Sequence, residues 1–378
     1  MTQRLPRQLF STFRPPPQVR YGTVTSVSTG ICTVKVAGGE IPVITINGAP
    51  VNVGDFVAVQ RQGPASYLLA VPSGAIWLAA NFNAGTATDM AAVRCTTSGS
   101  QAIVPFGPTG VQHVPWGASA GPKGSVWFTF GEAQVWSVQG TAVSSFPLGA
   151  NAQAYGLVLG PEGSMWICDS INGGLWSVAP NGAVAFLALP SGPFGAASPY
   201  AVAVGPDSAL YLTDTANEGV WRVVPPGGAA FYPSPAGLSS GLLGVCSGGG
   251  YLWVPDEYTN YVWRVTTGGN FTPFNLSSLS PTTLSLAVFG KDGNLYITDQ
   301  QPRVIQMAMD GSAVSIPLTQ GPAYGVCVGP DGNIWVAVTN GEASGAFLLG
   351  VKGGSQFADY TLGTLAQAIA VSQICAGP

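Results

Sequence analysis

Four carboxylates recur at one place in this sequence, each directly after a short apolar run that contains an aromatic residue. They are Asp169, Asp214, Asp256 and Asp299, and Glu257 follows the third of them. Two carboxylic acids at a suitable separation are sufficient for glycoside hydrolysis, in which one is the acid and the other the base or nucleophile. An aspartate after a strand also accepts backbone N–H bonds in the turn that follows. We favour the turn interpretation and keep carboxylate catalysis as the alternative.

Histidine and cysteine add little further chemistry. His113 is the only histidine, so a Ser-His-Asp or Cys-His site has one candidate base. We expect it to be a rim or packing histidine. No two cysteines form a C-x-x-C pair, which argues against a zinc site and for buried thiols, with a bridge between Cys95 and Cys375 left open. The six are Cys32, Cys95, Cys168, Cys246, Cys327 and Cys375. We therefore predict no catalytic residue, no metal, no cofactor and a protein that is not an enzyme.

Composition restricts the fold class. Only 8% of the 378 residues are charged and 46% are hydrophobic, which excludes a largely disordered chain. The 52 glycines and 31 prolines interrupt the chain too often for long helices. Mean hydropathy is +0.31, yet no run approaches the roughly 20 apolar residues of a membrane-spanning helix. The first residues lack an apolar signal-peptide region, so we expect no export signal and a β-rich protein.

A repeat organises most of the chain. One phrase recurs, consisting of a small apolar strand, a G-P-x-G type turn and an apolar strand with an aromatic residue, as in GPEGSMWICDS and GPDGNIWVAV. The aligned aromatics recur roughly every 43 residues, which is the period of a four-stranded propeller blade. They are Trp77, Trp127, Trp166, Tyr211, Trp253, Tyr296 and Trp335. The repeat predicts a seven-bladed β-propeller, and six or eight blades would require one copy to be misread.

The ring should be closed by its last strand. The first copy begins at AIWLAA without an inner strand of its own, whereas TLAQAIAVSQIC at the end matches an inner strand with nothing after it. We expect residues 365–373 to supply the inner strand of the blade built from residues 74–106. This closure covers two exposed strand edges.

One rim of such a propeller carries the loop after the second strand and the loop between blades, and rigidly placed loops are usual carriers of function. Its carboxylates, amides and tyrosines suit a saccharide or a polar protein surface, while the channel should be narrow and chemically plain. An ordinary polar rim is the competing interpretation. The predicted rim residues are Asp169, Asn172, Asp214, Asn217, Glu218, Asp256, Glu257, Tyr258, Asn260, Tyr261, Asp299, Gln301 and Asn340.

The N-terminal region does not carry the repeat. Residues 21–72 contain five short runs of alternating apolar and polar residues, which suits a small barrel of OB type. Residues 1–20 form a Pro-rich arm that contains no acid, and its basic residues are Arg4, Arg7, Arg14 and Arg20. Such an arm can dock on an acidic partner. With four lysines in the chain and no basic stripe, nucleic-acid binding is not expected. We predict an arm at 1–20, a barrel at 21–72 and a propeller at 73–378.

The phrases GPDGNIWVA and YLTDTANEGVWRV resemble the blades of the virginiamycin B lyase and NHL families of propellers, and the likeness covers residues 74–378. In the lyases, catalysis relies on a histidine pair, a carboxylate and a magnesium ion at the central axis. Because His113 is the only histidine, we expect that this site cannot be assembled and that the lyase chemistry does not transfer.

A second resemblance concerns the barrel. The pattern YGTVTSV, TVKVAGG, VGDFVAVQRQG and YLLA is similar to OB-like barrels in minor structural proteins of tailed bacteriophages. It implies a virion component whose arm and barrel dock on other virion proteins and whose propeller binds a protein or a host glycan. The low charge resembles interface composition and favours contacts with copies of itself. A lyase- or glycosidase-like propeller enzyme using rim carboxylates is the alternative, and a secreted scaffold fits less well.

Overall fold

A computed structural model describes residues 19–28, 31–36, 39–45, 56–62, 65–68, 75–83, 88–106, 115–235, 241–339, 346–362 and 370–377. The chain divides into two compact units, residues 1–74 and residues 75–378. Nearly all described secondary structure is β-strand, as the composition predicted, with two 3-10 turns, η1 (Pro122–Gly124) and η2 (Ser277–Leu279). No helix in the described part of the chain has the length and apolarity needed to cross a bilayer.

The first unit contains a closed barrel of five strands in the order β1-β2-β3-β5-β4. Strand β1 pairs antiparallel with both β2 and β4, which closes the ring, and the β3–β5 pair is parallel. The strands fall on alternating apolar and polar runs, the pattern of strands with one face turned inward. Their bounds are β1 (Val19–Ser28), β2 (Ile31–Val36), β3 (Gly39–Thr45), β4 (Phe56–Gln62) and β5 (Ala65–Leu68).

The second unit consists of seven four-stranded antiparallel sheets in the described residues, so the predicted seven-bladed propeller is confirmed. Blades 1 and 2 are formed by β33 (Ala370–Gly377), β6 (Ala75–Asn83), β7 (Thr88–Thr96), β8 (Gln101–Phe106), and by β9 (Gly117–Ala120), β10 (Val126–Thr129), β11 (Gln134–Gln139), β12 (Ala142–Pro147). Blades 3 and 4 are formed by β13 (Ala154–Leu159), β14 (Met165–Asp169), β15 (Gly174–Val178), β16 (Val184–Ala188), and by β17 (Pro199–Val204), β18 (Leu210–Asp214), β19 (Gly219–Val224), β20 (Gly228–Pro233). Blades 5 and 6 are formed by β21 (Cys246–Gly248), β22 (Tyr251–Pro255), β23 (Tyr261–Val265), β24 (Phe271–Asn275), and by β25 (Ala287–Phe289), β26 (Leu295–Thr298), β27 (Arg303–Met307), β28 (Ala313–Pro317). Blade 7 is formed by β29 (Ala323–Val328), β30 (Ile334–Thr339), β31 (Ala346–Lys352) and β32 (Ser355–Thr361).

Blade 3 shows why the repeat phrase folds this way. Strand β14, an apolar run, is buried along its whole length, whereas three of the five residues of the outer strand β16 are exposed. The G-P-x-G turn before β14 needs glycine, because a Cβ on Gly160 would lie 2.7 Å from Cδ1 of Trp166. Gly163 in the same turn has φ of +88°, a conformation that glycine adopts without strain.

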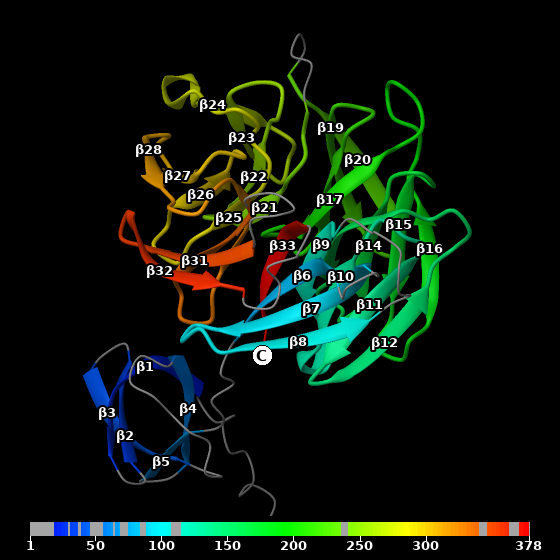
Figure 1. Cartoon of the computed structure of the whole chain (residues 1–378). Helices are drawn as coiled ribbons and strands as arrows, with labels where there is room; N and C mark the ends of the chain where they lie inside the picture. Colours follow the sequence, from blue (N-terminus) through cyan, green and yellow to red (C-terminus); the bar gives the residue numbers. More distant parts are fainter. Residues whose placement is uncertain are drawn as a thin grey trace, which may run out of the picture. The chain divides into compact units, whose positions relative to one another are not determined.

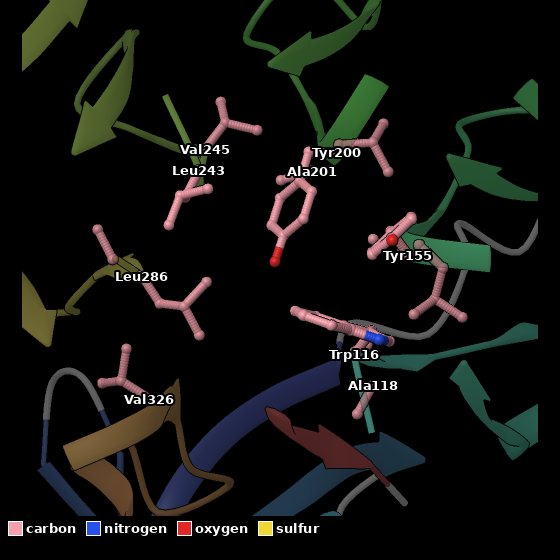
Figure 2. Close-up of a pocket in the computed structure, with 14 residues that line it drawn as sticks. Trp116, Ala118, Tyr155, Tyr200, Ala201, Leu243, Val245, Leu286 and Val326 are labelled. Atoms are coloured by element: carbon pink, nitrogen blue, oxygen red, sulfur yellow. The ribbon is translucent and has the colours of Figure 1, made fainter. Parts of the chain in front are cut away.

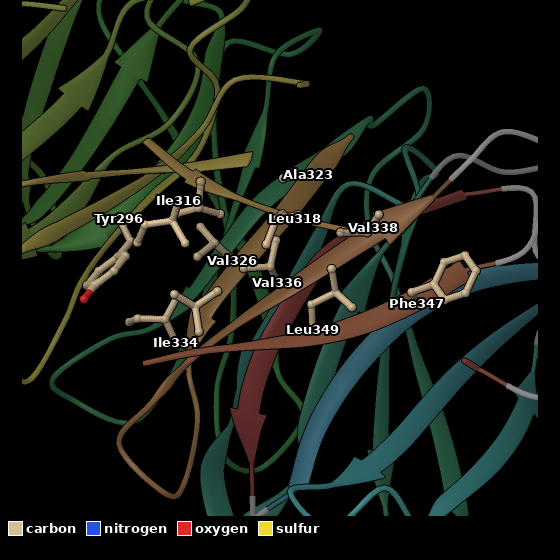
Figure 3. Close-up of a cluster of buried hydrophobic side chains, with 12 residues drawn as sticks. Tyr296, Ile316, Leu318, Ala323, Val326, Ile334, Val336, Val338, Phe347 and Leu349 are labelled. Atoms are coloured by element: carbon tan, nitrogen blue, oxygen red, sulfur yellow. The ribbon is translucent and has the colours of Figure 1, made fainter. Parts of the chain in front are cut away.

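The core lies between the blades. Seven clusters of buried apolar side chains occur in the described residues, each shared by two neighbouring blades, and together they follow the ring. Figure 3 shows the cluster between blades 6 and 7, where Tyr296 and Ile316 pack against Val336 and Leu349. Burial of each such aliphatic side chain contributes about 1.5–3 kcal/mol, so the blade contacts hold the wheel together.

The last strand closes the ring, as the sequence indicated. Strand β33 pairs antiparallel with β6, and Figure 1 shows the red end of the chain beside the blue-cyan first blade. The strand lies at 370–377, later than the predicted 365–373, and residues 363–369 are outside the described residues. The reason is register: Cys375 pairs with Trp77, as Cys327 pairs with Trp335 in blade 7.

Candidate functional site

The four aspartates of the repeat lie below the surface. Asp169, Asp214, Asp256 and Asp299 are all 0% exposed, at or just after the end of the second strand of blades 3 to 6. A buried carboxylate is tolerated only when hydrogen bonds replace its lost hydration. The structure supplies those bonds in each blade.

Asp214 shows the arrangement in full. Its Oδ1 accepts N–H bonds from Ser198 at 3.0 Å, Ala216 at 3.1 Å and Asn217 at 3.0 Å. Its Oδ2 accepts the side-chain amide of Asn217 at 2.9 Å and the indole N–H of Trp221 at 2.7 Å. The carboxylate thus joins the incoming inner strand, the following turn and the third strand of one blade. Both oxygens are occupied by the protein itself.

Blade 6 reaches the same result with a different donor. Its third strand has Ile305 opposite Ile297, where blade 4 has Trp221 opposite Leu212, so no indole N–H is available. Arg303 replaces it, and its Nη2 lies 2.6 Å from Oδ2 of Asp299. The carboxylate at this repeat position therefore keeps a donor even where the tryptophan is missing.

Five of the predicted rim residues are thus occupied by contacts within the protein. The four aspartates and Asn217, which is 1% exposed, turn no free polar group to a ligand, because the turns consume their hydrogen-bonding capacity. The turn interpretation accounts for them. Carboxylate catalysis at this rim has no exposed pair of these aspartates to work with.

The other predicted rim residues take different roles. The amide of Asn172 donates to Asp169 at 2.7 Å, and that of Gln301 donates to the carbonyl of Ser280 at 3.1 Å. Tyr261 packs against Trp263, whereas Tyr258 is 71% exposed. Glu218 and Glu257 are half-buried and Asn260 is exposed. Asn340, His113, Arg4, Arg7 and Arg14 are outside the described residues, and Arg20 belongs to β1.

Three exposed apolar or aromatic side chains lie at or beside these turns. The backbone N–H of Ile171 donates to Asp169, that of Tyr258 donates to Asp256, and that of Phe194 donates to Asn217 at 2.9 Å. Ile171 is 59% exposed, and Phe194 and Tyr258 are each 71% exposed. Polar side chains, among them Asn172 and Asn260, are exposed at the same turns, so the outer surface of this rim is mixed.

A pocket of about 170 Å³ lies at the propeller axis. Its walls come from the inner strands of blades 2 to 7 and the residues just before them. One wall is aromatic, formed by Trp116, Tyr155 and Tyr200, and the facing wall is aliphatic, as Figure 2 shows. The facing aliphatic residues are Leu243, Val245, Leu286 and Val326, and Leu157 and Val202 add to the apolar lining from the strands that carry Tyr155 and Tyr200. The channel is thus not chemically plain, which corrects the sequence-based expectation.

The three aromatic rings form one cluster. Ring centroids are 5.1 Å apart for Trp116 and Tyr155, 5.0 Å for Tyr155 and Tyr200, and 5.7 Å for Trp116 and Tyr200. The three aromatic residues occupy the same position of the repeat. The glycine after Trp116, Gly117, lies against the carbonyl of Tyr155 in the next blade, and the glycine after Tyr155, Gly156, lies against that of Tyr200. One signal was available in the sequence, because Trp116 is the tryptophan outside the two strand columns of the repeat.

Electrostatics distinguish the two tyrosines. The hydroxyl of Tyr155 donates to Oε1 of Gln153 at 3.0 Å. Burial raises the pKa of Tyr200 well above its usual range, and Tyr155 and Glu257 raise it further. Tyr200 therefore keeps its proton at neutral pH and acts as a hydrogen-bond donor rather than a base.

The pocket does not fit a magnesium ion. Mg²⁺ prefers carboxylate and other oxygen ligands in octahedral geometry, and the described lining offers two phenols and backbone carbonyls. Nor do the described side chains elsewhere bring together three His, Cys, Asp or Glu residues that could hold a metal. Cys95 is a free thiol, so the disulfide to Cys375 that the sequence left open is not formed. Burial raises the pKa of the Cys95 thiol to about 11.

Residues 135–346 match the model of the virginiamycin B lyase family. The chain belongs to that family. This match spans the end of blade 2 to the third strand of blade 7 and includes the Tyr155 and Tyr200 wall of the axial pocket. No curated protein sequence matches the chain.

Solved structures agree in fold. A catalytically inactive virginiamycin B lyase from Staphylococcus aureus with quinupristin has a TM-score of 0.60 and 18% identity, covering 68% of this chain and 91% of that one. A streptogramin B lyase has a TM-score of 0.59 and 20% identity, covering 71% and 92%. A Lactobacillus plantarum protein has a TM-score of 0.58 and 14% identity, covering 80% and 98%.

Family membership corrects one prediction. The sequence led us to expect a protein that is not an enzyme, and that expectation is wrong, because the family and its solved lyases are enzymatic. The expectation rested largely on the single histidine of the sequence, and that feature does not by itself exclude membership of an enzyme family.

Proposed function

We propose that this chain is a lyase-family propeller enzyme whose substrate places one aromatic-ring-sized apolar group in the axial pocket. The observation that carries the proposal is the pocket itself, with its aromatic wall facing an aliphatic wall at the axis. Its volume of about 170 Å³ suits one ring, since an apolar cavity of about 150 Å³ is known to take up benzene. Membership of a lyase family favours a substrate as the occupant of the pocket.

The walls favour such a group energetically. Burying a phenyl-sized group contributes about 1.5–3 kcal/mol, and aromatic contacts add about 0.5–1.5 kcal/mol. The lining contains no charged side chain, so an apolar ring displaces water without leaving a buried charge unpaired. Proximity to Tyr155 and Tyr200 also gives the bound group two phenols as neighbours.

Binding and turnover of quinupristin, the compound found with the Staphylococcus aureus relative, test this proposal. We expect the full chain to bind quinupristin in calorimetry and to convert it in a mass-spectrometric assay. Trp116→Ala should weaken binding roughly tenfold by removing one ring of the wall. Phe194→Ala is the matched control, because Phe194 is 71% exposed and outside the pocket. No binding by the wild type, or equal binding by Trp116→Ala, would refute the proposal.

We also propose that the arm at 1–20 and the barrel, an OB-like module, attach the propeller to a bacteriophage particle. The resemblance of residues 21–72 to phage barrels supports this location, and so does a barrel that is compact apart from the propeller. The expected partners are other virion proteins and copies of this chain, with a host glycan or protein as a further ligand.

Purified particles test the attachment. We expect the wild-type chain at a fixed copy number in the particles, by mass spectrometry and electron microscopy. A variant with Arg4, Arg7, Arg14 and Arg20 all replaced by Gln should be soluble but absent from particles. Arg222→Gln on the propeller is the control for loss of an arginine outside the arm. Wild-type particles that lack the chain would exclude this location.

A further inference from the structure

The hydroxyl of Tyr200 is the polar group that the axial pocket presents to a ligand. Figure 2 shows the ring of Tyr200 reaching toward the middle of the pocket with its oxygen foremost. Among the described residues, its oxygen has no hydrogen-bond partner, whereas the hydroxyl of Tyr155 is engaged by Gln153. One donor at the centre of an apolar pocket is how such sites orient a ligand.

The pocket lining carries no charged side chain. A ring with a negative charge would lose its hydration there without meeting a cation, and that desolvation costs free energy. An uncharged ring with a hydrogen-bond acceptor avoids this cost.

We propose that the group bound in the axial pocket is an uncharged ring carrying an oxygen acceptor, which accepts a hydrogen bond from Tyr200. This specificity rests on the proposed function, because it assumes that a ring occupies the pocket. It narrows the substrate class to neutral aryl carbonyl compounds such as esters, amides or ketones. Tyr200 is a specificity-determining donor in this assignment.

Four small probes of similar size test the assignment, namely acetophenone, toluene, benzoate and benzylammonium. Dissociation constants are measured by ligand-observed NMR with the full chain at pH 7. We expect acetophenone to bind roughly five- to tenfold more tightly than toluene, the worth of one hydrogen bond. Benzoate should bind more weakly than acetophenone, although both carry oxygen acceptors.

One variant tests the donor. Tyr200→Phe should remove the advantage of acetophenone over toluene and leave toluene unchanged. Benzoate that binds as tightly as acetophenone would contradict the preference for an uncharged ring. Tyr251→Phe is the control, since Tyr251 begins β22 outside the pocket. Unchanged melting temperatures show that the variants remain folded.

The outcomes distinguish the two levels of the proposal. Equal binding of acetophenone and toluene to the wild type, or an advantage that survives Tyr200→Phe, would overturn the role of Tyr200 while leaving a ring-binding pocket. Tightest binding of benzylammonium would also overturn it, because Tyr200 would then act as an acceptor. No binding of any probe would refute the ring-binding pocket together with this inference.

Discussion

The buried carboxylate of Asp214 offers the sharpest test of how this propeller is built. Replacing it by alanine leaves three backbone N–H groups, the amide of Asn217 and the indole N–H of Trp221 without their acceptor. These donors come from the segment before β17, from the turn after β18 and from β19 of blade 4. Because the site is closed to solvent, water cannot take over every bond.

The expected cost follows from that set of bonds. Removing one partner from a buried charged network destabilises a protein by about 3–5 kcal/mol. For a chain of this size, each kcal/mol lowers Tm by about 2 °C, so we expect a drop of roughly 6–10 °C. Asp214→Asn should cost less, since it keeps an oxygen for the backbone N–H groups and loses the charge.

Differential scanning calorimetry of the full chain measures this loss. Asp359→Ala is the matched control, because Asp359 is exposed and accepts bonds from Thr319 and Gln320 on the outer strand of blade 7. Exposed interactions contribute about 0–1 kcal/mol, so its Tm should stay within about 2 °C. A similarly small change for Asp214→Ala would refute the structural reading of the repeat carboxylates and restore them as candidate ligand-binding groups.

Three further predictions concern the thiols, the closure and the ion pair. Burial raises the pKa of the Cys95 thiol to about 11, above its value near 9 in the unfolded chain. The protonated thiol therefore contributes its full stability below pH 9, and this contribution is lost as pH rises through 11. Between pH 8 and 11.5, the Tm of Cys95→Ala should fall less steeply than that of the wild type. Deleting residues 370–378 should expose the edge of β6 and produce aggregation with a Tm more than about 10 °C lower, and a stable monomer on sedimentation would contradict the closure. Arg303→Met should lower the free energy of unfolding by about 3–5 kcal/mol, because it leaves the buried charge of Asp299 without its cation. Adding Asp299→Leu should recover part of this free energy. A double variant that is less stable than either single variant would show that the ion pair is stabilising in itself.

The repeat made the fold predictable. Aromatics such as Trp166 and Trp253 stand at a regular spacing between turn residues, and an isolated blade cannot bury both faces, so a closed ring was the consistent solution. The closing strand begins at Ala370, five residues after the predicted start, because a repeat phrase predicts that a strand exists more reliably than where it begins. The pairing that decides the register, Cys375 with Trp77, is a contact between the two ends of the propeller.

The site was harder to predict, for physical reasons. Asp214 and Asp256 looked like rim ligands because sequence reveals residue type and loop position, but not whether a neighbouring indole occupies the carboxylate. Trp116, Tyr155 and Tyr200 meet because three blades turn the same repeat position toward one axis. Such convergence depends on ring closure, and each residue alone resembles an ordinary strand aromatic.

A crystal structure of the chain soaked with acetophenone addresses the central claim most directly. We expect the ring between the Trp116–Tyr200 wall and Leu286, with its carbonyl oxygen within hydrogen-bond distance of the Tyr200 hydroxyl. Ligand found on the outer loops at full occupancy, with the axial pocket still free of it, would contradict the claim.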